Sequence, residues 1–275
     1  MTTTNKLNEA ACLISIVTLG NFPSNDLSLT IRLTLERVNS ISLEWIFVLY
    51  DNAQCQAFLK SDEVRLLLSK SIVPKAIWCD SGISNSMNLG IGISKADWLL
   101  VLHAGDYLII SDQDKESLRH NLLCEESMIQ IYGTFYRNYR GDLIPTRHYE
   151  DNKCRSFLYP WVPHQSTFVK REVYQEVSYD AFFKSAMDYD FFLKCSKLGI
   201  KATVFPEFIS VFQLGGTSSN IVKSLKEVYF SLLKNNSSNF FSWLSVNFIF
   251  FHIVFLKISF LLKEKMVLAI NTVTD

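Results

Sequence analysis

A short apolar run that ends in a small polar turn constrains the fold of this chain most. Residues 99–102 are Leu-Leu-Val-Leu, and His103, Ala104, Gly105 and Asp106 follow them. Apolar residues without alternation are typical of a strand that is covered on both faces. Ligands of open α/β sheets bind beyond the carboxyl ends of the strands. The sequence therefore predicts Asp106 at a ligand-binding edge, although Gly105-Asp106 alone also fits a simple turn.

Apolar runs and helix-like segments alternate before this point. Residues 13–19, 45–50 and 75–79 are expected to be strands. Residues 27–38 carry apolar side chains at every third or fourth position, which predicts a helix, and a further helix is expected at about residues 54–70. Such alternation predicts a parallel sheet with right-handed crossovers.

Three of the expected strands are followed by an acid, namely Asp51, Asp80 and Asp106. Three carboxylates at one sheet edge suit ribose hydroxyls, a nucleobase N–H or a metal ion. The chain has no GxGxxG motif after its first strand and no GxxxxGK[ST] motif. It therefore does not fit dinucleotide oxidoreductases or P-loop enzymes.

Composition excludes further classes of protein. The 27 Lys and Arg residues balance the 27 Asp and Glu residues, which disfavours nucleic acid as a partner. The six cysteines have no metal-site spacing, which predicts free thiols in a reducing compartment. Residues 1–9 lack the apolar core of a secretory signal. We therefore expect a cytoplasmic chain.

From about residue 118 the alternation breaks down, and polar motifs follow. His164-Gln165-Ser166 lies in an aromatic and proline-rich stretch, and Asp188 and Asp190 fall at the expected start of a helix, where the helix dipole favours acids.

In order and spacing, the motifs resemble the family-2 glycosyltransferases, and among these the bacterial enzymes that build colanic acid, O-antigen and related surface polysaccharides. The resemblance covers about residues 12–220. Its motifs are Ile14-Ser15-Ile16-Val17-Thr18, Asp51, Asp80-Ser81-Gly82-Ile83, Met87-Asn88-Leu89-Gly90, His103-Ala104-Gly105-Asp106, His164-Gln165-Ser166, Asp188-Tyr189-Asp190 and Gly215-Gly216-Thr217-Ser218. It implies an α/β GT-A fold with a Rossmann-like, mostly parallel sheet, an acceptor-side extension and C-terminal helices. Residues 1–220 would form this domain, with a nucleotide-sugar half at about 12–117 and an acceptor half at about 118–220.

The resemblance also implies roles for individual residues. The nucleobase would be bordered by Thr18, Leu19, Gly20 and Asn21 and hydrogen-bonded by Asp51, while Asp80, Gly82 and Asn88 would line the nucleotide side. Asp106 would hold Mg²⁺ or Mn²⁺ on the diphosphate, and Asp188 would be the catalytic base. From the residues alone, Asp188 also fits a helix N-cap, and Asp190 a solvated acid of the first turn. His164 and Gln165 either face the acceptor or satisfy a buried loop.

The chain departs from the family pattern at the metal motif and near the donor sugar. The metal motif usually carries two or three acids, whereas here Asp106 stands alone with His103. Hard cations prefer oxygen ligands, so we expect His103 to be a structural or phosphate-side hydrogen-bonding group. Ser84-Asn85-Ser86 replaces a common Tyr-Asp-Ala, which removes an acid.

Residues 221–275 form a separate C-terminal segment, in which residues 240–262 are mostly Phe, Leu, Ile and Val. The run is long enough to span a bilayer, but Asn247, His252 and Lys257 interrupt it. Its polar residues mostly share one arc, which favours a helix in the membrane surface, with two following lysines near anionic head groups. A packed helix pair, a homodimer contact and a spanning helix are the alternatives.

The leading hypothesis is an inverting, metal-dependent glycosyltransferase of the hexosyl or N-acetylhexosaminyl class. It would use a nucleotide sugar, with a UDP-sugar as first choice, and a lipid-linked saccharide acceptor in bacterial surface-polysaccharide biosynthesis. Its expected place is the cytoplasmic face of the inner membrane. The alternative is a catalytically silent, nucleotide-sugar-binding scaffold, because the metal motif is thinned.

Overall fold

The computed structural model describes residues 14–38, 42–124, 126–137, 141–145, 162–213 and 221–236, together with 244, 246–248, 250–255 and 258. Several sequence predictions lie outside these residues. They concern the first nine residues, the Gly215-Gly216-Thr217-Ser218 loop, Cys12, Cys154 and much of the run at 240–262.

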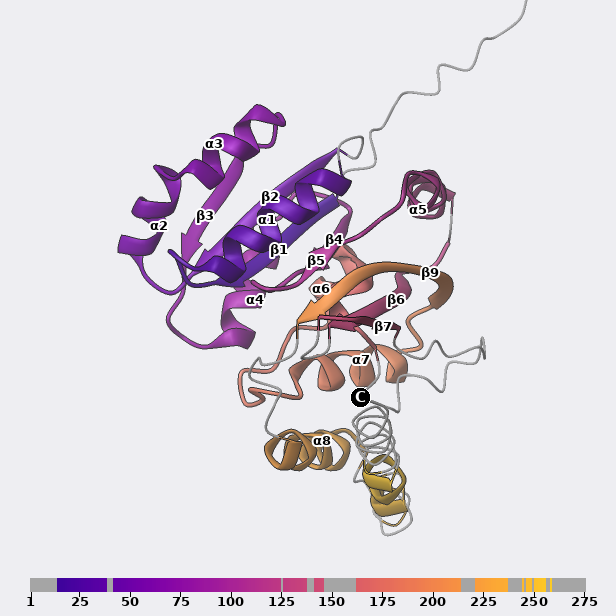
Figure 1. Ribbon diagram of the computed structural model, residues 1–275. Helices are drawn as coiled ribbons and strands as arrows, with labels where there is room; N and C mark the ends of the chain where they lie inside the picture. Colours follow the sequence, from indigo (N-terminus) through magenta and orange to yellow (C-terminus); the bar gives the residue numbers. More distant parts are fainter. Residues whose placement is uncertain are drawn as a thin grey trace, which may run out of the picture.

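The first part of the chain forms the predicted parallel sheet (Figure 1). Strands β1 (Ile14–Gly20), β2 (Leu43–Leu49), β3 (Pro74–Trp78) and β4 (Trp98–Val101) lie in the order β3-β2-β1-β4, and all three pairings are parallel. The helices that connect them are α1 (Asn25–Arg37), α2 (Asn52–Leu59), α3 (Asp62–Ser69) and α4 (Ile83–Gly92).

Local sequence explains where these helices begin. Ser24 accepts a hydrogen bond from the backbone N–H of Leu27 and so caps α1, whose buried side chains include Leu27, Ile31 and Leu35. The single helix predicted at residues 54–70 is wrong, because the Ser61 hydroxyl caps the backbone of Val64 and starts a new helix. The helix predicted from apolar side chains at every third or fourth position is thus confirmed as α1. The segment predicted as one helix forms two helices, α2 and α3.

The second part of the chain extends the same sheet with mixed pairing. Strand β8 (Thr167–Lys170) runs antiparallel to β4, and β6 (Ile129–Arg137) runs antiparallel to β8. Next comes β9 (Ala202–Gln213), parallel to β6, and then β5 (Tyr107–Leu108). Short β7 (Leu143–Pro145) pairs with β6 off this path, so that the described residues form one nine-stranded sheet.

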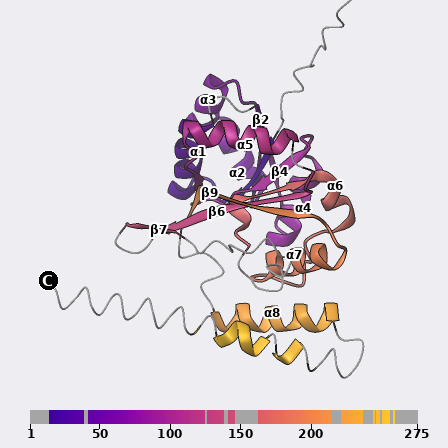
Figure 2. The ribbon, with the colours of Figure 1, turned by 90° about the vertical axis from the view of Figure 1, so that its right-hand side faces the viewer.

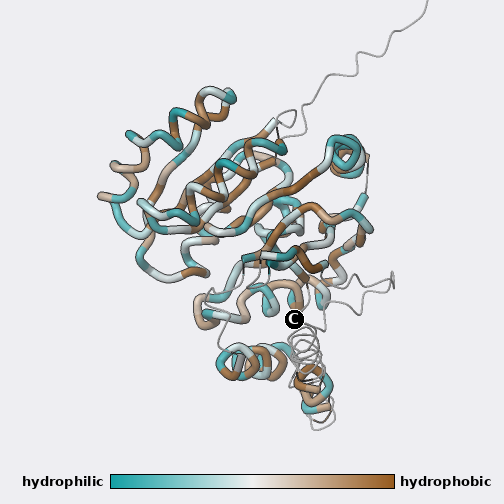
Figure 3. The backbone as a smooth tube through the Cα atoms, viewed as in Figure 1, coloured by the Kyte–Doolittle hydropathy of each residue, from teal (hydrophilic) through white to brown (hydrophobic). Residues whose placement is uncertain are grey.

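Helices cover both faces of this sheet, which makes a mixed α/β fold. The remaining elements are α5 (Asp112–Cys124), the 3₁₀ turn η2 (His164–Ser166), α6 (Arg171–Glu176) and α7 (Met187–Lys197). One buried cluster joins the sheet to α1, α2, α3 and α5, and a second joins it to α4, α6 and α7. Figure 3 shows the central strands as apolar, whereas α5 is largely hydrophilic.

Helix α8 (Ile221–Asn236) packs below α7 together with the described residues that follow it (Figure 2). Val228 and Leu232 of α8 share a buried cluster with Leu193 of α7 and with Val246 and Ile253. For these residues the structure thus shows the packing that was an alternative to the expected membrane-surface helix. Within the described ranges, we find no helix with the length and apolar character needed to cross a membrane.

Gly90 allows α4 to approach the sheet closely, and this predicts a large effect of a single methyl group. An added Cβ would lie 2.5 Å from Cγ1 of Val17 and 2.9 Å from Cγ2 of Val48. Gly90→Ala should therefore lower the free energy of unfolding by about 1–3 kcal/mol. Gly92→Ala is the matched control, because its Cβ would meet nothing within 4 Å. Equal denaturation midpoints for the two variants would contradict this packing.

Candidate functional site

A cavity of about 670 Å³ opens at the carboxyl ends of the parallel strands. Its walls come from the loops after β1, β2, β3 and β4, from η2, from the start of α7 and from the end of β9. This is the edge at which the sequence predicts a ligand site. The predicted residues that line the cavity are Leu19, Gly20, Asn21, Asp80, Gly82, His103, Asp106, His164 and Asp188.

Asp106 lies in a tight turn after β4 that helix α1 holds in place. The backbone N–H of Gly105, which has φ +103°, donates to the Thr30 hydroxyl at 2.8 Å and to the Asp26 carbonyl at 3.2 Å. The side chain of Asp106 is only 3% exposed, and its Oδ1 accepts the backbone N–H of Gln213 at 3.1 Å. Burial raises the pKa of Asp106 to about 7. A nearby cation would therefore favour its ionised form.

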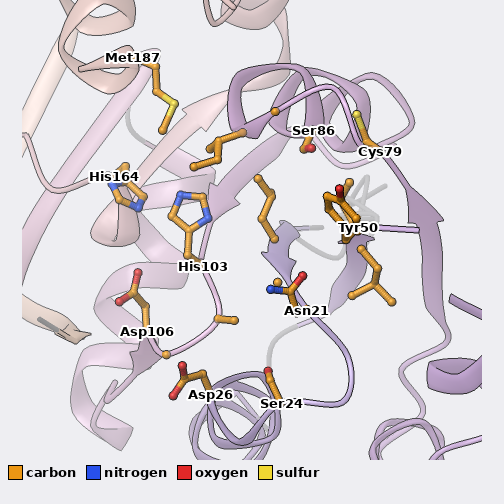
Figure 4. A pocket seen from close by; sticks show the side chains of 18 of the residues that line it. Asn21, Ser24, Asp26, Tyr50, Cys79, Ser86, His103, Asp106, His164 and Met187 are labelled. Atoms are coloured by element: carbon orange, nitrogen blue, oxygen red, sulfur yellow. The ribbon is translucent and has the colours of Figure 1, made fainter. Parts of the chain in front are cut away.

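Two histidines meet at the same side of the cavity, as Figure 4 shows. The ring centroids of His103 and His164 are 4.9 Å apart. Burial lowers the pKa of His103 to about 3, so that its imidazole is neutral at neutral pH. A neutral ring can accept or donate one hydrogen bond, as the sequence prediction for this residue requires.

Asp188 forms an ion pair with one of these histidines. Its Oδ2 lies 3.1 Å from Nδ1 of His164. Burial alone would raise the pKa of Asp188, but the charge and hydrogen bond of His164 outweigh burial and lower it. For His164, burial would lower the pKa, and the Asp188 charge outweighs it and raises the pKa.

The ion pair leaves one atom on each partner without a hydrogen bond. Oδ1 of Asp188 and Nε2 of His164 are buried and have no hydrogen-bond partner among the described residues. The N-cap alternative for Asp188 is wrong, because Ala186 is the N-cap of α7 and no side chain caps it from that position. A buried carboxylate oxygen that the fold does not use is free for a ligand.

The structure overturns the alternative in which Asp190 is a solvated acid of the first helical turn. Asp190 is fully buried instead of solvated, and it pairs with Lys194 of its own helix. It also accepts hydrogen bonds from Ser231 at 2.8 Å and Asn235 at 3.0 Å, both on α8. Asp190 therefore links α7 to α8 by hydrogen bonds, and it is not among the residues that line the cavity.

Four predicted site residues are not among the residues that line the cavity, and three of these have hydrogen-bond partners within the fold. Thr18 accepts the indole N–H of Trp45 at 2.8 Å, and Asp51 caps α2 by accepting the backbone N–H of Gln54 at 2.8 Å. Asn88 exchanges two hydrogen bonds with the backbone of Tyr179, at 2.8 and 3.0 Å. Gln165 is buried in η2, as the buried-loop alternative for this residue expects. The fold itself thus uses the polar side chains of Thr18, Asp51 and Asn88.

Other lining residues were not foreseen from the sequence, among them Tyr50, Lys184, Asp26 and Met187 (Figure 4 labels all but Lys184). Tyr50 directly follows β2, so the end of that strand was a usable signal for it. No sequence pattern indicates that Lys184 lines the cavity, because it lies in an irregular segment before α7 and follows no strand.

The charge of the lining is mostly negative. Asp26, Asp80, Asp106 and Asp188 face a single lysine or arginine among the described lining residues, namely Lys184. The described part of the chain contains no cluster of three or more His, Cys, Asp or Glu side chains that could hold a metal ion. The residues fit a divalent cation held by Asp106 together with oxygens of an anionic ligand, and not a cage made by the protein alone.

The chain matches no family model and no curated protein. Solved structures do resemble it. The Staphylococcus aureus TarS 1–349 structure in complex with UDP-GlcNAc has a TM-score of 0.61 at 12% identity, over 88% of this chain and 71% of that one. A second structure of TarS 1–349 has a TM-score of 0.59 at 12% identity, over 80% of this chain and 65% of that one.

A mannosyltransferase, PcManGT from Pyrobaculum calidifontis in complex with GDP-Man and Mn²⁺, has a TM-score of 0.58 at 11% identity. This match covers 80% of this chain and 63% of that one. The chain thus spans slightly less than two thirds of the length of some of these structures. Identities this low show the fold alone, and the chain accordingly has a mixed α/β fold of the GT-A type, as these structures do.

Proposed function

We propose that this chain is an inverting glycosyltransferase that transfers a sugar from a nucleotide-diphosphate sugar to a hydroxyl group of a saccharide. The observation that carries the proposal is the pair of carboxylates in one cavity, Asp106 after β4 and Asp188 on α7, of which Asp188 keeps a buried oxygen without a partner. The fold supports it, because the neighbours were solved with UDP-GlcNAc and with GDP-Man.

The donor nucleotide would occupy the part of the cavity next to β1, β2 and β3. The Tyr50 ring is 59% exposed and lines the cavity, so that a nucleobase can stack on it. Asn21 and Asp80 supply polar atoms nearby. The cavity volume lies in the range of small-molecule sites. A UDP-sugar is our first choice of donor, and a hexosyl or N-acetylhexosaminyl group the expected cargo.

Asp106 would face the diphosphate. A bound Mg²⁺ or Mn²⁺ there supplies charge that opposes the leaving diphosphate. The acidic lining gives the reason, since His164 is paired with Asp188, and Lys184 is the one lysine or arginine among the described lining residues that faces a diphosphate beside Asp26, Asp80 and Asp106. Neutral His103 would hydrogen-bond to the phosphate side.

Asp188 would act as the base. Its Oδ2 is held by His164, and its free Oδ1 is the atom that would accept the proton of the acceptor hydroxyl as this oxygen attacks the anomeric carbon. Direct attack inverts the anomeric configuration. Because the pKa of Asp188 is lowered, it is a weak base, and its contribution comes from its position.

The C-terminal segment suits an acceptor that is anchored in a lipid surface. Leu244, Phe248, Phe251, Phe255 and Ile258 recur every three or four residues and are between 51 and 76% exposed. On the opposite side, residues 246 and 253 are buried against α8. This two-faced pattern favours a helix that lies on a membrane, which we place on the cytoplasmic face of the inner membrane, in surface-polysaccharide biosynthesis.

One observation is also consistent with a second function. The absence of a three-ligand metal cluster among the described residues also fits a catalytically silent scaffold that binds nucleotide sugars. Release of free nucleotide from a donor, in the presence of Mn²⁺ and a saccharide acceptor, separates the two. A scaffold would bind the donor and release none.

The metal assignment predicts the effect of Asp106→Asn. The amide removes the charge that would face the cation, and it keeps the size and buried position of the side chain. We expect Mn²⁺-dependent binding of the nucleotide sugar to be lost, as measured by calorimetry. Asp112→Asn on the exposed start of α5 is a matched control. Wild-type affinity with an unchanged Mn²⁺ requirement would show that Asp106 does not hold the metal.

The base assignment predicts a different result for Asp188→Asn. Transfer should fall by about two orders of magnitude or more, the usual range for a lost general base, while the affinity for the donor stays the same. Single-turnover transfer and donor titration measure the two quantities. Equal losses in both would mark Asp188 as structural, and a product with retained configuration would exclude direct attack.

The lipid-surface proposal predicts that Phe251→Ser combined with Phe255→Ser releases the chain from anionic vesicles. Each phenylalanine buried in lipid contributes on the order of 1.5–3 kcal/mol, so that binding should weaken by at least tenfold in co-sedimentation. Leu123→Ser, at an exposed position on α5, serves as control. A changed oligomer mass with unchanged vesicle binding would instead show a dimer contact.

A further inference from the structure

A carboxylate from helix α8 holds the backbone that leads into the catalytic helix. Oε2 of Glu227 accepts three consecutive backbone N–H groups, from Lys184 at 2.9 Å, Ser185 at 2.6 Å and Ala186 at 3.0 Å. Glu227 is only 9% exposed. A buried carboxylate that receives three N–H groups forms strong, charge-assisted hydrogen bonds.

One of these bonds satisfies the backbone N–H of Ala186, the N-cap residue of α7, and the other two hold the two residues before it. The first N–H groups of a helix have no partner within the helix, and Ala186 at the N-cap offers no side chain for them. Glu227 supplies an acceptor from another helix for the N–H of Ala186, and its negative charge also suits the positive end of the helix dipole. The start of α7 therefore depends on α8.

The segment held in this way is a wall of the cavity. Lys184, Ser185, Met187 and Asp188 line it. On the other side, the Ser84 hydroxyl of α4 donates to the Phe183 carbonyl at 2.9 Å, and it lies 3.3 Å from the sulfur of Met187. The segment is thus fixed between α4 and α8.

Helix α8 is itself anchored where Glu227 needs it. Fully buried Asp190 accepts hydrogen bonds from Ser231 and Asn235, one and two helical turns beyond Glu227. Val228 and Leu232 pack against Leu193 of α7. These contacts fix α8 along the length of α7.

We propose that Glu227 is a positioning residue for Asp188, and that α8 is therefore part of the active site although it contributes no side chain to the cavity wall. The inference rests on the proposed role of Asp188 as the base. It assigns to the first helix of the C-terminal segment a function apart from any membrane or dimer contact: α8 sets the place of the carboxylate oxygen that receives the proton.

The test compares Glu227→Gln and Glu227→Ala with Lys226→Gln, an exposed neighbour on the same helix. Small displacements of a reacting group cost up to about 100-fold, so we expect kcat to fall roughly 10- to 100-fold for Glu227→Ala and less for Glu227→Gln, whose amide oxygen still accepts. The Kd for UDP with Mn²⁺ should stay within about twofold, because none of the residues that line the cavity lies on α8. Lys226→Gln should behave like the wild type. Unchanged kcat in both Glu227 variants would overturn the proposal.

A double variant separates positioning from a general structural role. If Glu227 acts through Asp188, adding Glu227→Gln to Asp188→Asn should cause no further loss of transfer. Losses that multiply would show that Glu227 acts elsewhere and would overturn the proposal.

A second measurement does not depend on turnover. Amide hydrogen exchange at residues 184–186 should be faster in Glu227→Ala than in Lys226→Gln, without any donor present. Unchanged exchange would overturn the anchoring. If the wild type binds no nucleotide sugar and transfers none, the proposed function fails on its own, and the exchange result still decides whether Glu227 holds this segment.

Discussion

The antiparallel pairing of β4 with β8 is the constraint on which the site depends. Leu100 pairs with Phe168, so β8 starts beside the point where β4 ends. The turn after β4 carries Asp106, and η2 directly before β8 carries His164. A parallel β8 would place His164 at the opposite edge of the sheet. This one pairing therefore brings the acidic turn of the first half and the histidine of the second half to the same cavity.

Around this junction, the two carboxylates have opposite environments. Asp106 is buried without a strong partner, which raises its pKa to about 7, whereas the pKa of Asp188 is lowered by His164 in spite of burial. A charge of +2 beside Asp106 would keep it ionised, whereas His164 already keeps Asp188 ionised. The difference suits a metal-side role for Asp106 and a proton-accepting role for Asp188, each of which we propose. The hold of Glu227 on the start of α7 extends this arrangement to α8.

The sequence predicted the parallel half of the fold well, because continuous apolar runs and the helical stripe of α1 are strong local signals. It also predicted Asp51, Asp80 and Asp106 at one ligand-binding edge, and of these Asp80 and Asp106 line the cavity together with Asp188, which the family resemblance named. It misplaced Asp51, since a polar residue after a strand serves equally well as a helix N-cap, and only three-dimensional contacts distinguish the two. The burial of Asp190 and the hold of Glu227 depend on contacts between helices distant in sequence, which no local pattern encodes.

The central claim is that the cavity binds a nucleoside diphosphate with the help of a divalent cation. Titration calorimetry of the full chain with UDP, GDP, CDP and dTDP, each with and without Mn²⁺, tests it most directly. The account predicts that at least one of the four binds at a single site and that its affinity falls by about tenfold or more without the metal, which corresponds to at least 1.4 kcal/mol. If none of the four binds with Mn²⁺ present, or if the bound nucleotide is indifferent to the metal, the account is contradicted.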